Sequence, residues 1–290
     1  MSAAGQLAPV LEAGGPGLAE GLRLTEGRLA EIVGGHGEAL GGHAGGTLAA
    51  GGKRLRPLLV FLCAAATPST GAVAAAAAVE LLHMATLVHD DVLDRATLRR
   101  GVPTVFATAG PDAATATGDF LFSRAFAELA GTGSASSVEA LSVASSALAR
   151  GELMQRADAW STGVTTERYL RRCELKTGSL FAASCQLGAL LGGRPGAESR
   201  TLSEFGERTG VAFQILDDVL DVAGSAERTG KRRGADILDG TVTLPLILAR
   251  SRDPEIAALD LRSISTPDSA AALCDRIVST GALDEVERYA

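Results

Sequence analysis

The arrangement of apolar and polar positions along the chain predicts a succession of helices. The pattern is clearest over residues 58–66 and 72–96, each of which is predicted to form one helix. Aromatic residues make up only 4% of the chain, and long intervals lack proline. This composition is typical of helices that pack closely through small side chains. The sequence therefore predicts an all-α fold.

The N-terminal part carries a weaker pattern. Residues 1–20 are rich in glycine and alanine, and we expect them to be poorly ordered. Helical periodicity begins near Gly21 and stays weak through a glycine-rich stretch that ends at Gly46. Because each glycine is about 1 kcal/mol worse than alanine in a helix, this stretch forms either loops or helices held only by packing. The folded domain is expected to span residues 21–290.

Residues 81–101, LLHMATLVHDDVLDRATLRRG, place three carboxylates in an otherwise apolar helix. Asp90 and Asp94 share one helix face, with Asp91 to one side. Like charges at this spacing repel by roughly a few tenths of a kcal/mol per pair, so the pattern requires a compensating cation. A solvated acidic turn would explain one such cluster equally well.

A second cluster repeats the spacing at residues 213–221, FQILDDVLD, with Asp217, Asp218 and Asp221. Two clusters of the same form make the solvated turn a poor explanation. Carboxylate oxygens suit Mg²⁺, which usually keeps several waters and shares one or two carboxylates with substrate phosphates. Each cluster is therefore predicted to hold part of a metal–diphosphate group.

With these paired motifs, the chain resembles the trans-type polyprenyl diphosphate synthases from about Gly51 to Pro245. The resemblance implies a single large helical bundle of the isoprenoid synthase type, in which two DDxxD motifs face each other across a central cavity. It also implies a prenyltransferase that uses three Mg²⁺ ions to condense isopentenyl diphosphate with an allylic diphosphate. The expected metal ligands are Asp90, Asp94 and Asp217, with Asp91, Asp218 and Asp221 as further candidates.

The basic segment GGKRLRP, residues 51–57, would by itself be interpreted as a solvated turn. Beside two aspartate clusters, its cations at a helix start indicate a diphosphate site. The resemblance assigns isopentenyl diphosphate to Lys53, Arg56, His83 and Arg100. For His83, a buried core histidine is the alternative interpretation.

The allylic diphosphate is assigned by the same resemblance to residues on other segments: Arg99, Lys176 and Thr177, with Gln214 and Lys231 as further substrate contacts. Asp236 also fits the family pattern, as an outer-shell metal residue. No side-chain nucleophile is needed. The residues expected to carry the reaction are Asp90, Asp91, Asp94, Asp217, Asp218, Lys176 and Lys231.

Product length in this family depends on the residues four and five positions before the first aspartate, where a bulky aromatic side chain closes the hydrocarbon tunnel. Those positions are Thr86 and Ala85 here, so we expect a product of C20 or longer. The chain departs from the family at Thr241, where a second lysine is common, and at Phe106, where asparagine is usual. It also stops at Ala290, so the usual C-terminal helices are expected to be missing.

The amino-acid composition limits the kinds of partner that the protein can bind. A net charge of −7 argues against a nucleic-acid surface, which needs a broad positive field. Four scattered cysteines without a CxxC pair indicate buried thiols in a reducing cytoplasm. No secretory signal is apparent, and residues 68–71 interrupt the apolar span 57–79, which favours two core helices over a membrane segment. An apolar product could still bring the protein to a membrane surface, and the resemblance implies a homodimer.

Two alternatives stay open. A terpene cyclase of the same fold uses an aspartate-rich motif and Mg²⁺, but has no need of the GGKRLRP and RRG segments for a second diphosphate. A weakly active subunit of a heteromeric synthase usually loses one aspartate motif, whereas both are intact here.

Overall fold

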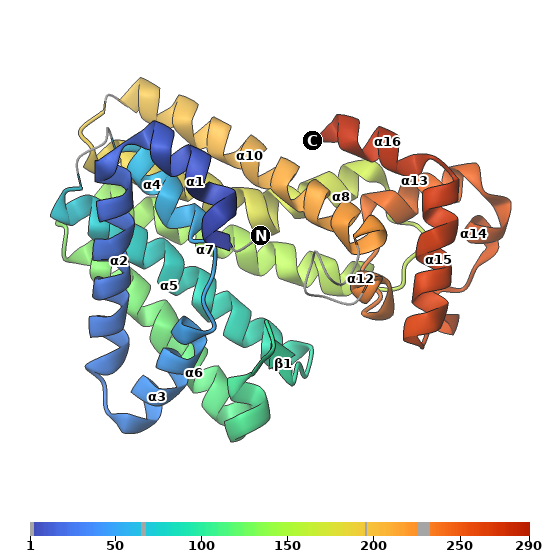
Figure 1. Cartoon of the computed structure of the whole chain (residues 1–290), viewed down its shortest axis with the longest axis horizontal. Helices are drawn as coiled ribbons and strands as arrows, with labels where there is room; N and C mark the ends of the chain where they lie inside the picture. The colour runs from blue at the N-terminus through green and yellow to red at the C-terminus, as the bar shows by residue number, and fades with distance from the viewer. Residues whose placement is uncertain (1–2, 65–67, 195, 225–232) are drawn as a thin grey trace. The chain divides into compact units, whose positions relative to one another are not determined.

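The computed structural model describes residues 3–64, 68–194, 196–224 and 233–290. These form helices and one short antiparallel hairpin, so the predicted all-α class is confirmed (Figure 1). The chain divides into two compact units. The first comprises Met1–Ser145 and Leu180–Gly206, and the second comprises Ser146–Ser179 and Glu207–Ala290.

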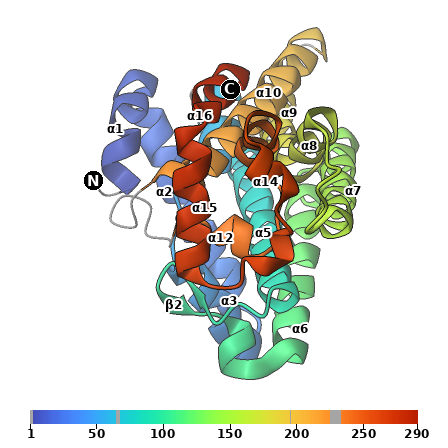
Figure 2. The ribbon, with the colours of Figure 1, turned by 90° about the vertical axis from the view of Figure 1, so that its right-hand side faces the viewer.

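The first unit holds most of the long helices. In chain order its elements are α1 (Ala3–Gly14), α2 (Pro16–Gly34), α3 (Glu38–Ala49), α4 (Leu55–Cys63), α5 (Thr70–Leu93), β1 (Leu98–Arg99), β2 (Val102–Pro103), α6 (Val105–Ala130), the start of α7 (Ala135–Asp158), α9 (Ser179–Leu191) and the start of α10 (Gly196–Ala223). Helix α5 is the central element, with contacts to α2, α3, α4 and α6. The α3 helix lies beside the hairpin and the start of α6 (Figure 2).

Helical structure begins earlier in the chain than the sequence pattern indicated. Helix α1 and the first residues of α2 lie within residues 1–20, where we expected little order, and α3 is a helix despite its glycines. Packing explains α2, since its buried residues recur every three or four positions. Gly21 lies against the ring of Phe61, where a Cβ atom would approach within 2.8 Å. Of the two alternatives for this stretch, helices held by packing are the correct one.

Helix α5 is capped and buried. The Ser69 hydroxyl accepts a hydrogen bond from the Ala72 N–H, and the four alanines 75–78 are fully buried. The helix ends at Leu93, with Asp94 as its C-cap, a few residues before the expected end. Within the described residues it is the single helix long and apolar enough to cross a membrane, but 67% of its apolar window is buried inside the protein. Burial supports the prediction of a core helix.

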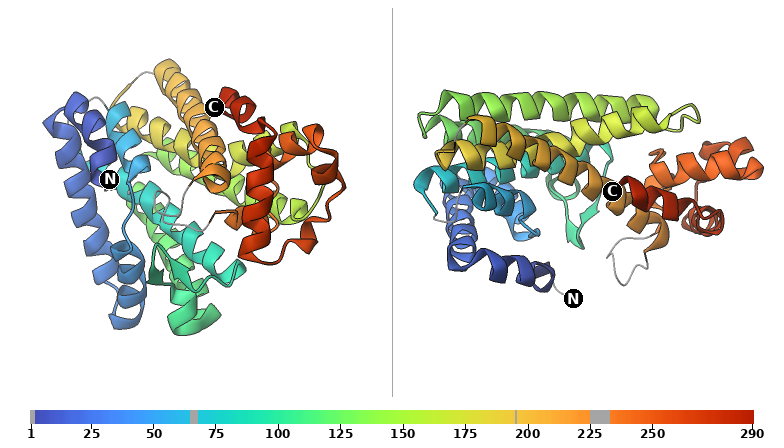
Figure 3. Two further views of the ribbon diagram at one scale, coloured as in Figure 1. Left: turned by 45° about the vertical axis from the view of Figure 1, so that its right-hand side comes forward. Right: turned by 90° about the horizontal axis from the view of Figure 1, so that it is seen from above.

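The second unit contains shorter helices. They are the rest of α7 and α10 together with α8 (Thr166–Cys173), the π-helix η1 (Glu174–Gly178), α12 (Ala235–Leu238), α13 (Leu244–Arg252), α14 (Pro254–Ala258), η2 (Leu261–Ser263), α15 (Pro267–Ser279), α16 (Ala282–Val286) and η3 (Glu287–Tyr289). Both views of Figure 3 show α13 to α16 gathered together, in orange and red. The hydrophobic core of the second unit includes the fully buried Tyr169, Ile215 and Leu244.

Two further features concern residues singled out in the sequence. The segment that carries Lys176 and Thr177 is the π-turn Glu174–Gly178, which separates α8 from α9. All four cysteines are free and buried, as the sequence predicted.

Candidate functional site

The three carboxylates of the first motif lie at the end of α5 and differ in how deeply they are buried. Asp91 is buried, and its Oδ1 accepts a hydrogen bond from Nε of Arg99 at 2.8 Å and forms an ion pair with Nη2 at 2.8 Å. Burial raises the pKa of Asp91, and the Arg99 guanidinium opposes that rise. Asp90 is half-buried and Asp94 is exposed, one turn apart, with the Asp94 N–H donating to the Asp90 carbonyl at 2.8 Å. Asp91 therefore anchors the hairpin, while Asp90 and Asp94 remain accessible.

Four arginines surround His83 on α5. Burial, together with the positive charges of Arg56, Arg100, Arg99 and Arg54, holds the pKa of His83 well below its usual value. The imidazole is therefore neutral at pH 7, and it can accept or donate a hydrogen bond without adding charge. Guanidinium groups grip phosphate oxygens in a bidentate manner, so this cluster is suited to an anion that carries several charges.

Backbone conformation brings these cations together. Arg54 and Arg100 both adopt left-handed conformations, with φ of 50° and 53°. Such conformations are unfavourable for residues with side chains and cluster at functional sites. A Cβ atom at Gly52 would lie 3.1 Å from a guanidinium nitrogen of each of these arginines. The glycine turn therefore lets two like-charged groups lie against the backbone.

Arg54 has a structural role that the sequence did not reveal. Its Nε donates to Oε1 of Glu26 at 2.5 Å, and its Nη1 donates to Oε1 of Glu80 at 2.6 Å. Glu80 is almost completely buried in α5. A lone acidic residue in the middle of an apolar helix was the available signal, since such a group needs a partner when buried. These bonds connect the loop before α4 to α2 and α5.

Arg56 carries an unsatisfied donor. Its Nε is buried without a hydrogen-bond partner among the described residues, and its guanidinium lies over the ring of Phe181, 4.9 Å from the centroid. Burial lowers the pKa of Arg56 to about 10. Because buried donors are rarely left unpaired, this group points to a bound ligand. Lys53, on the same turn, is exposed.

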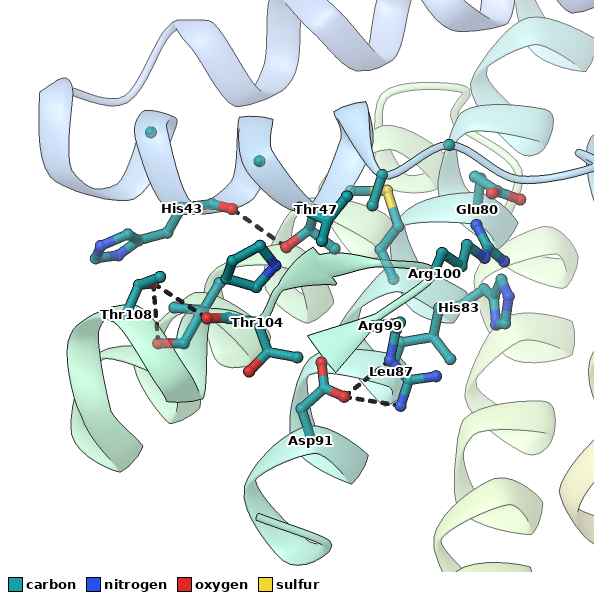
Figure 4. A pocket seen from close by; sticks show the side chains of 18 of the residues that line it. His43, Thr47, Glu80, His83, Leu87, Asp91, Arg99, Arg100, Thr104 and Thr108 are labelled. Carbon is teal, nitrogen blue, oxygen red and sulfur yellow. Dashed lines mark hydrogen bonds and ion pairs between the residues drawn. The ribbon is translucent and has the colours of Figure 1, made fainter. Parts of the chain in front are cut away.

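A pocket of about 320 Å³ lies between α3, α5, the hairpin and the start of α6 (Figure 4). His83 and Arg100 line one end, while His43 and Thr108 lie at the other. Its apolar lining is Met84, Leu87, Val102, Pro103 and Val105. The volume is that of a small ligand site, with a cationic end suited to an anionic head group.

Two α3 glycines, Gly42 and Gly46, leave the pocket open. A Cβ atom at either position would meet no other atom within 4 Å. Gly45 on the same helix is equally uncrowded but does not line the pocket.

In the second motif, as in the first, one carboxylate is buried and hydrogen-bonded to protein donors while another is exposed. Asp218 is buried and accepts hydrogen bonds from the Tyr169 hydroxyl at 2.6 Å and from Nε2 of Gln214 at 2.8 Å. Burial raises the pKa of Asp218 to about 6. The Thr177 hydroxyl donates to Oε1 of Gln214 at 2.8 Å. Asp217 is exposed on α10. Tyr169 was not predicted, because only the fold brings it to Asp218.

Asp221, the third carboxylate of this motif, accepts from the backbone N–H groups of Ala235 and Asp236 at 3.2 and 3.3 Å. It therefore holds the start of α12. The predicted site residue Lys231 lies outside the described residues.

Lys176 lies on the π-turn η1 and is held by α7. Its Nζ donates to Oε2 of Glu152 at 2.5 Å and to Oε1 of Gln155 at 3.2 Å. Burial raises the pKa of Glu152, but the Lys176 and Arg156 cations outweigh it, so the net pKa is lowered. Single π-turns occur frequently at functional sites. The sequence did not single out Glu152 and Gln155, because only the fold brings them to Lys176.

The two positions predicted to control the length of the product differ in their burial. Ala85 is completely buried in the first unit, whereas Thr86 is half-buried and donates its hydroxyl to the His83 carbonyl at 2.8 Å. Thr86 is therefore the more accessible of the pair.

Within the described part of the chain, no group of three or more histidine, cysteine, aspartate or glutamate side chains could hold a metal ion alone. The side-chain donors that each DDxxD motif itself supplies are carboxylates. This set fits a hard cation such as Mg²⁺, which takes few protein ligands and completes its shell with water and phosphate oxygens.

Residues 40–279 match the polyprenyl synthetase family model. The chain belongs to the polyprenyl synthetase family. It is 41% identical over 244 residues to heptaprenyl diphosphate synthase component 2 of Geobacillus stearothermophilus, a match covering 83% of this chain and 76% of that protein. It is 39% identical over 201 residues to octaprenyl diphosphate synthase of Escherichia coli, a match covering 69% of this chain but only 62% of that protein.

Solved structures agree with this assignment. This polyprenyl synthetase superposes on heptaprenyl diphosphate synthase from Staphylococcus aureus with a TM-score of 0.86 and 31% identity, over 93% of this chain and 86% of that one. Polyprenyl synthase from Caulobacter crescentus, solved with calcium and isoprenyl diphosphate, gives a TM-score of 0.82 and 34% identity, over 98% and 87%. The protein is thus a prenyltransferase with the isoprenoid synthase fold.

Removing the Tyr169 hydroxyl should weaken the second motif. In Tyr169→Phe the buried Asp218 loses one donor, so we expect the free energy of unfolding to fall by about 1–3 kcal/mol. Chemical denaturation measures this change. Tyr289→Phe is the matched control, because that ring is 46% exposed on η3 and its change should stay within about 0.5 kcal/mol. Equal losses in the two variants would show that the hydrogen bond contributes nothing.

Proposed function

We propose that this polyprenyl synthetase catalyses the Mg²⁺-dependent condensation of isopentenyl diphosphate with an allylic diphosphate. The observation that carries the proposal is the pocket lined by Arg54, Arg99, Arg100 and His83, at the end of α5 that also carries Asp90 and Asp94. A compact cationic cluster beside accessible carboxylates suits two diphosphates, one bound directly by arginine and the other through a metal.

Isopentenyl diphosphate is the ligand of the cationic cluster in this proposal. Its diphosphate is bound by Lys53, Arg56 and Arg100, with a hydrogen bond from His83. The buried unpaired Nε of Arg56 and the cationic end of the pocket support this assignment. The five-carbon group of the substrate occupies the neighbouring pocket, whose volume of about 320 Å³ is sufficient for it.

The allylic diphosphate is bound through carboxylates and a second set of cations. Asp90, Asp94 and Asp217 are the proposed Mg²⁺ ligands, and Lys176 and Arg99 contact phosphate oxygens. A Mg²⁺ ion held by these carboxylates would supply positive charge against the leaving diphosphate. The held carboxylates Asp91 and Asp218 support this assignment of roles, because their hydrogen bonds turn them toward protein donors.

The reaction then needs no nucleophilic side chain. The C–O bond of the allylic diphosphate breaks, and the double bond of isopentenyl diphosphate attacks the resulting allylic cation. A proton is lost to the departed diphosphate, and the product is one five-carbon unit longer. The fixed guanidinium groups stabilise negative charge without reorganising during the reaction.

A product of C20 or longer is part of the proposal. Small side chains at positions 85 and 86 support it, as do relatives whose names range from geranylgeranyl to decaprenyl diphosphate synthase.

One observation favours a second candidate function, that of a subunit requiring a partner. The relative from Geobacillus is named as component 2 of a heptaprenyl diphosphate synthase.

The proposed reaction is tested with purified protein, Mg²⁺, isopentenyl diphosphate and farnesyl diphosphate, followed by mass analysis of the dephosphorylated prenols. We expect prenols up to C20 or longer, no product in excess EDTA, and restoration by Mg²⁺. Asp90→Asn and Asp217→Asn should each lower kcat by about a hundredfold. A folded wild-type protein that consumes no isopentenyl diphosphate would contradict the proposal and favour the partner-dependent subunit.

Filling the pocket tests where isopentenyl diphosphate lies. In Gly46→Ala the new methyl group enters the pocket without a clash, and we expect the KM for isopentenyl diphosphate to rise about tenfold while the KM for the allylic substrate is unchanged. Gly45→Ala is the matched control, since it gives α3 the same gain in helix propensity outside the pocket. Equal KM values for the two variants would exclude this pocket as the substrate site.

Product length should respond to Thr86. A phenylalanine at this half-buried position, about one turn before Asp90, is expected to shorten the longest product by at least one five-carbon unit. Thr86→Ser keeps the hydroxyl and adds no bulk, so its products should match those of the wild type. Mass analysis of the prenols measures both, and an unchanged distribution in Thr86→Phe would show that this side chain does not line the tunnel.

A further inference from the structure

The residue before the first aspartate motif has an environment that metal binding does not explain. Nε2 of His89 lies 3.3 Å from Oδ1 of Asp119, which is on α6. Asp119 is exposed and the imidazole is partly so, and an ion pair in that setting contributes little by itself. A second, independent contact on α6 gives the pair its significance.

That contact is with Gly118. A Cβ atom there would overlap the His89 ring at Nε2, Cδ2 and Cε1, so the imidazole lies directly against the α6 backbone. Gly118 is buried in the interior of a helix, where glycine is less favourable than alanine. The close approach of the His89 ring accounts for a glycine at this position.

The residues before and after Asp90 in the sequence are therefore both held by other elements of the fold. On a helix, His89 and Asp91 project to opposite sides of Asp90, each rotated by about 100°. His89 is held by α6, through Gly118 and Asp119, and Asp91 is held by Arg99 of the hairpin. Two contacts in different directions set the rotation of the last turn of α5. Metal sites require carboxylates that are held close to the productive geometry.

We propose that His89 is a positioning residue that orients Asp90 for metal binding by packing its imidazole against Gly118 and contacting the Asp119 carboxylate. This proposal rests on the proposed function, in which Asp90 is a metal ligand. The ring acts through the backbone of α5, and its Nε2 is turned toward α6, against Gly118 and Asp119.

Double-variant analysis of positions 89 and 118 tests the proposal. The readout is Mn²⁺ affinity in the presence of inorganic diphosphate, measured by electron paramagnetic resonance without turnover. We expect His89→Ala and Gly118→Ala each to weaken Mn²⁺ binding about tenfold, since residues supporting metal ligands have effects of this order. The double variant should be no weaker than either single variant, because the new methyl group occupies the space that the ring left.

Conservative and unrelated substitutions are the controls. His89→Gln keeps a planar donor that can reach Asp119, and it should recover part of the affinity. Gly27→Ala places a methyl group in open space on α2, and it should leave Mn²⁺ affinity unchanged. If Gly118→Ala does not fold, His89→Ala and His89→Gln still decide the matter.

The outcomes separate this proposal from the proposed function. Wild-type affinity in His89→Ala, or additive losses in the double variant, would overturn the positioning role while prenyl transfer by the wild type still stood. A wild-type protein that forms no prenol product with Mg²⁺ would instead overturn the proposed function.

Discussion

The concentration of like charge around His83 is the constraint on which the first unit depends. Burial, together with the positive charges of four guanidinium groups, lowers the pKa of His83 and keeps the imidazole neutral. Guanidinium groups repel one another unless carboxylates or a ligand compensate them. Glu26 and Glu80 bind Arg54, and Asp91 binds Arg99. Among the described residues Arg56 and Arg100 form no ion pair, and in the proposed function the diphosphate of the substrate is their counterion. The proposal therefore assigns stability and substrate binding to one set of charges.

The two aspartate motifs follow the same division of labour. In each, the second aspartate is buried and held by protein donors, Arg99 for Asp91 and Tyr169 with Gln214 for Asp218. The first aspartate, Asp90 or Asp217, is more exposed. A buried, hydrogen-bonded carboxylate fixes the helix turn that carries its neighbour, and this explains why two adjacent aspartates are more useful than one. Family membership as a polyprenyl synthetase agrees with both motifs.

Small residues in this protein serve two opposite purposes. Gly21 and Gly118 admit an aromatic or imidazole ring against a helix backbone, so that side chain and helix pack without a gap. Gly42 and Gly46 instead face open space, and they leave room beside the cationic cluster. The same residue type therefore provides close packing in one place and an empty volume in another, and only the neighbouring helices distinguish the two.

The sequence by itself determined the helical class, the two carboxylate motifs, the basic turn and the buried cysteines, because these follow from local periodicity and residue chemistry. Tertiary structure alone decided that Arg54 is bound by Glu80, that Lys176 is held by Glu152, and that Asp218 rather than Asp217 is buried. It also decided that α2 and α3 are helices despite their glycines and that Ala85 belongs to the core. Each of these outcomes depends on partners distant in sequence, whose contacts override local propensity and are invisible to a pattern with a period of a few residues.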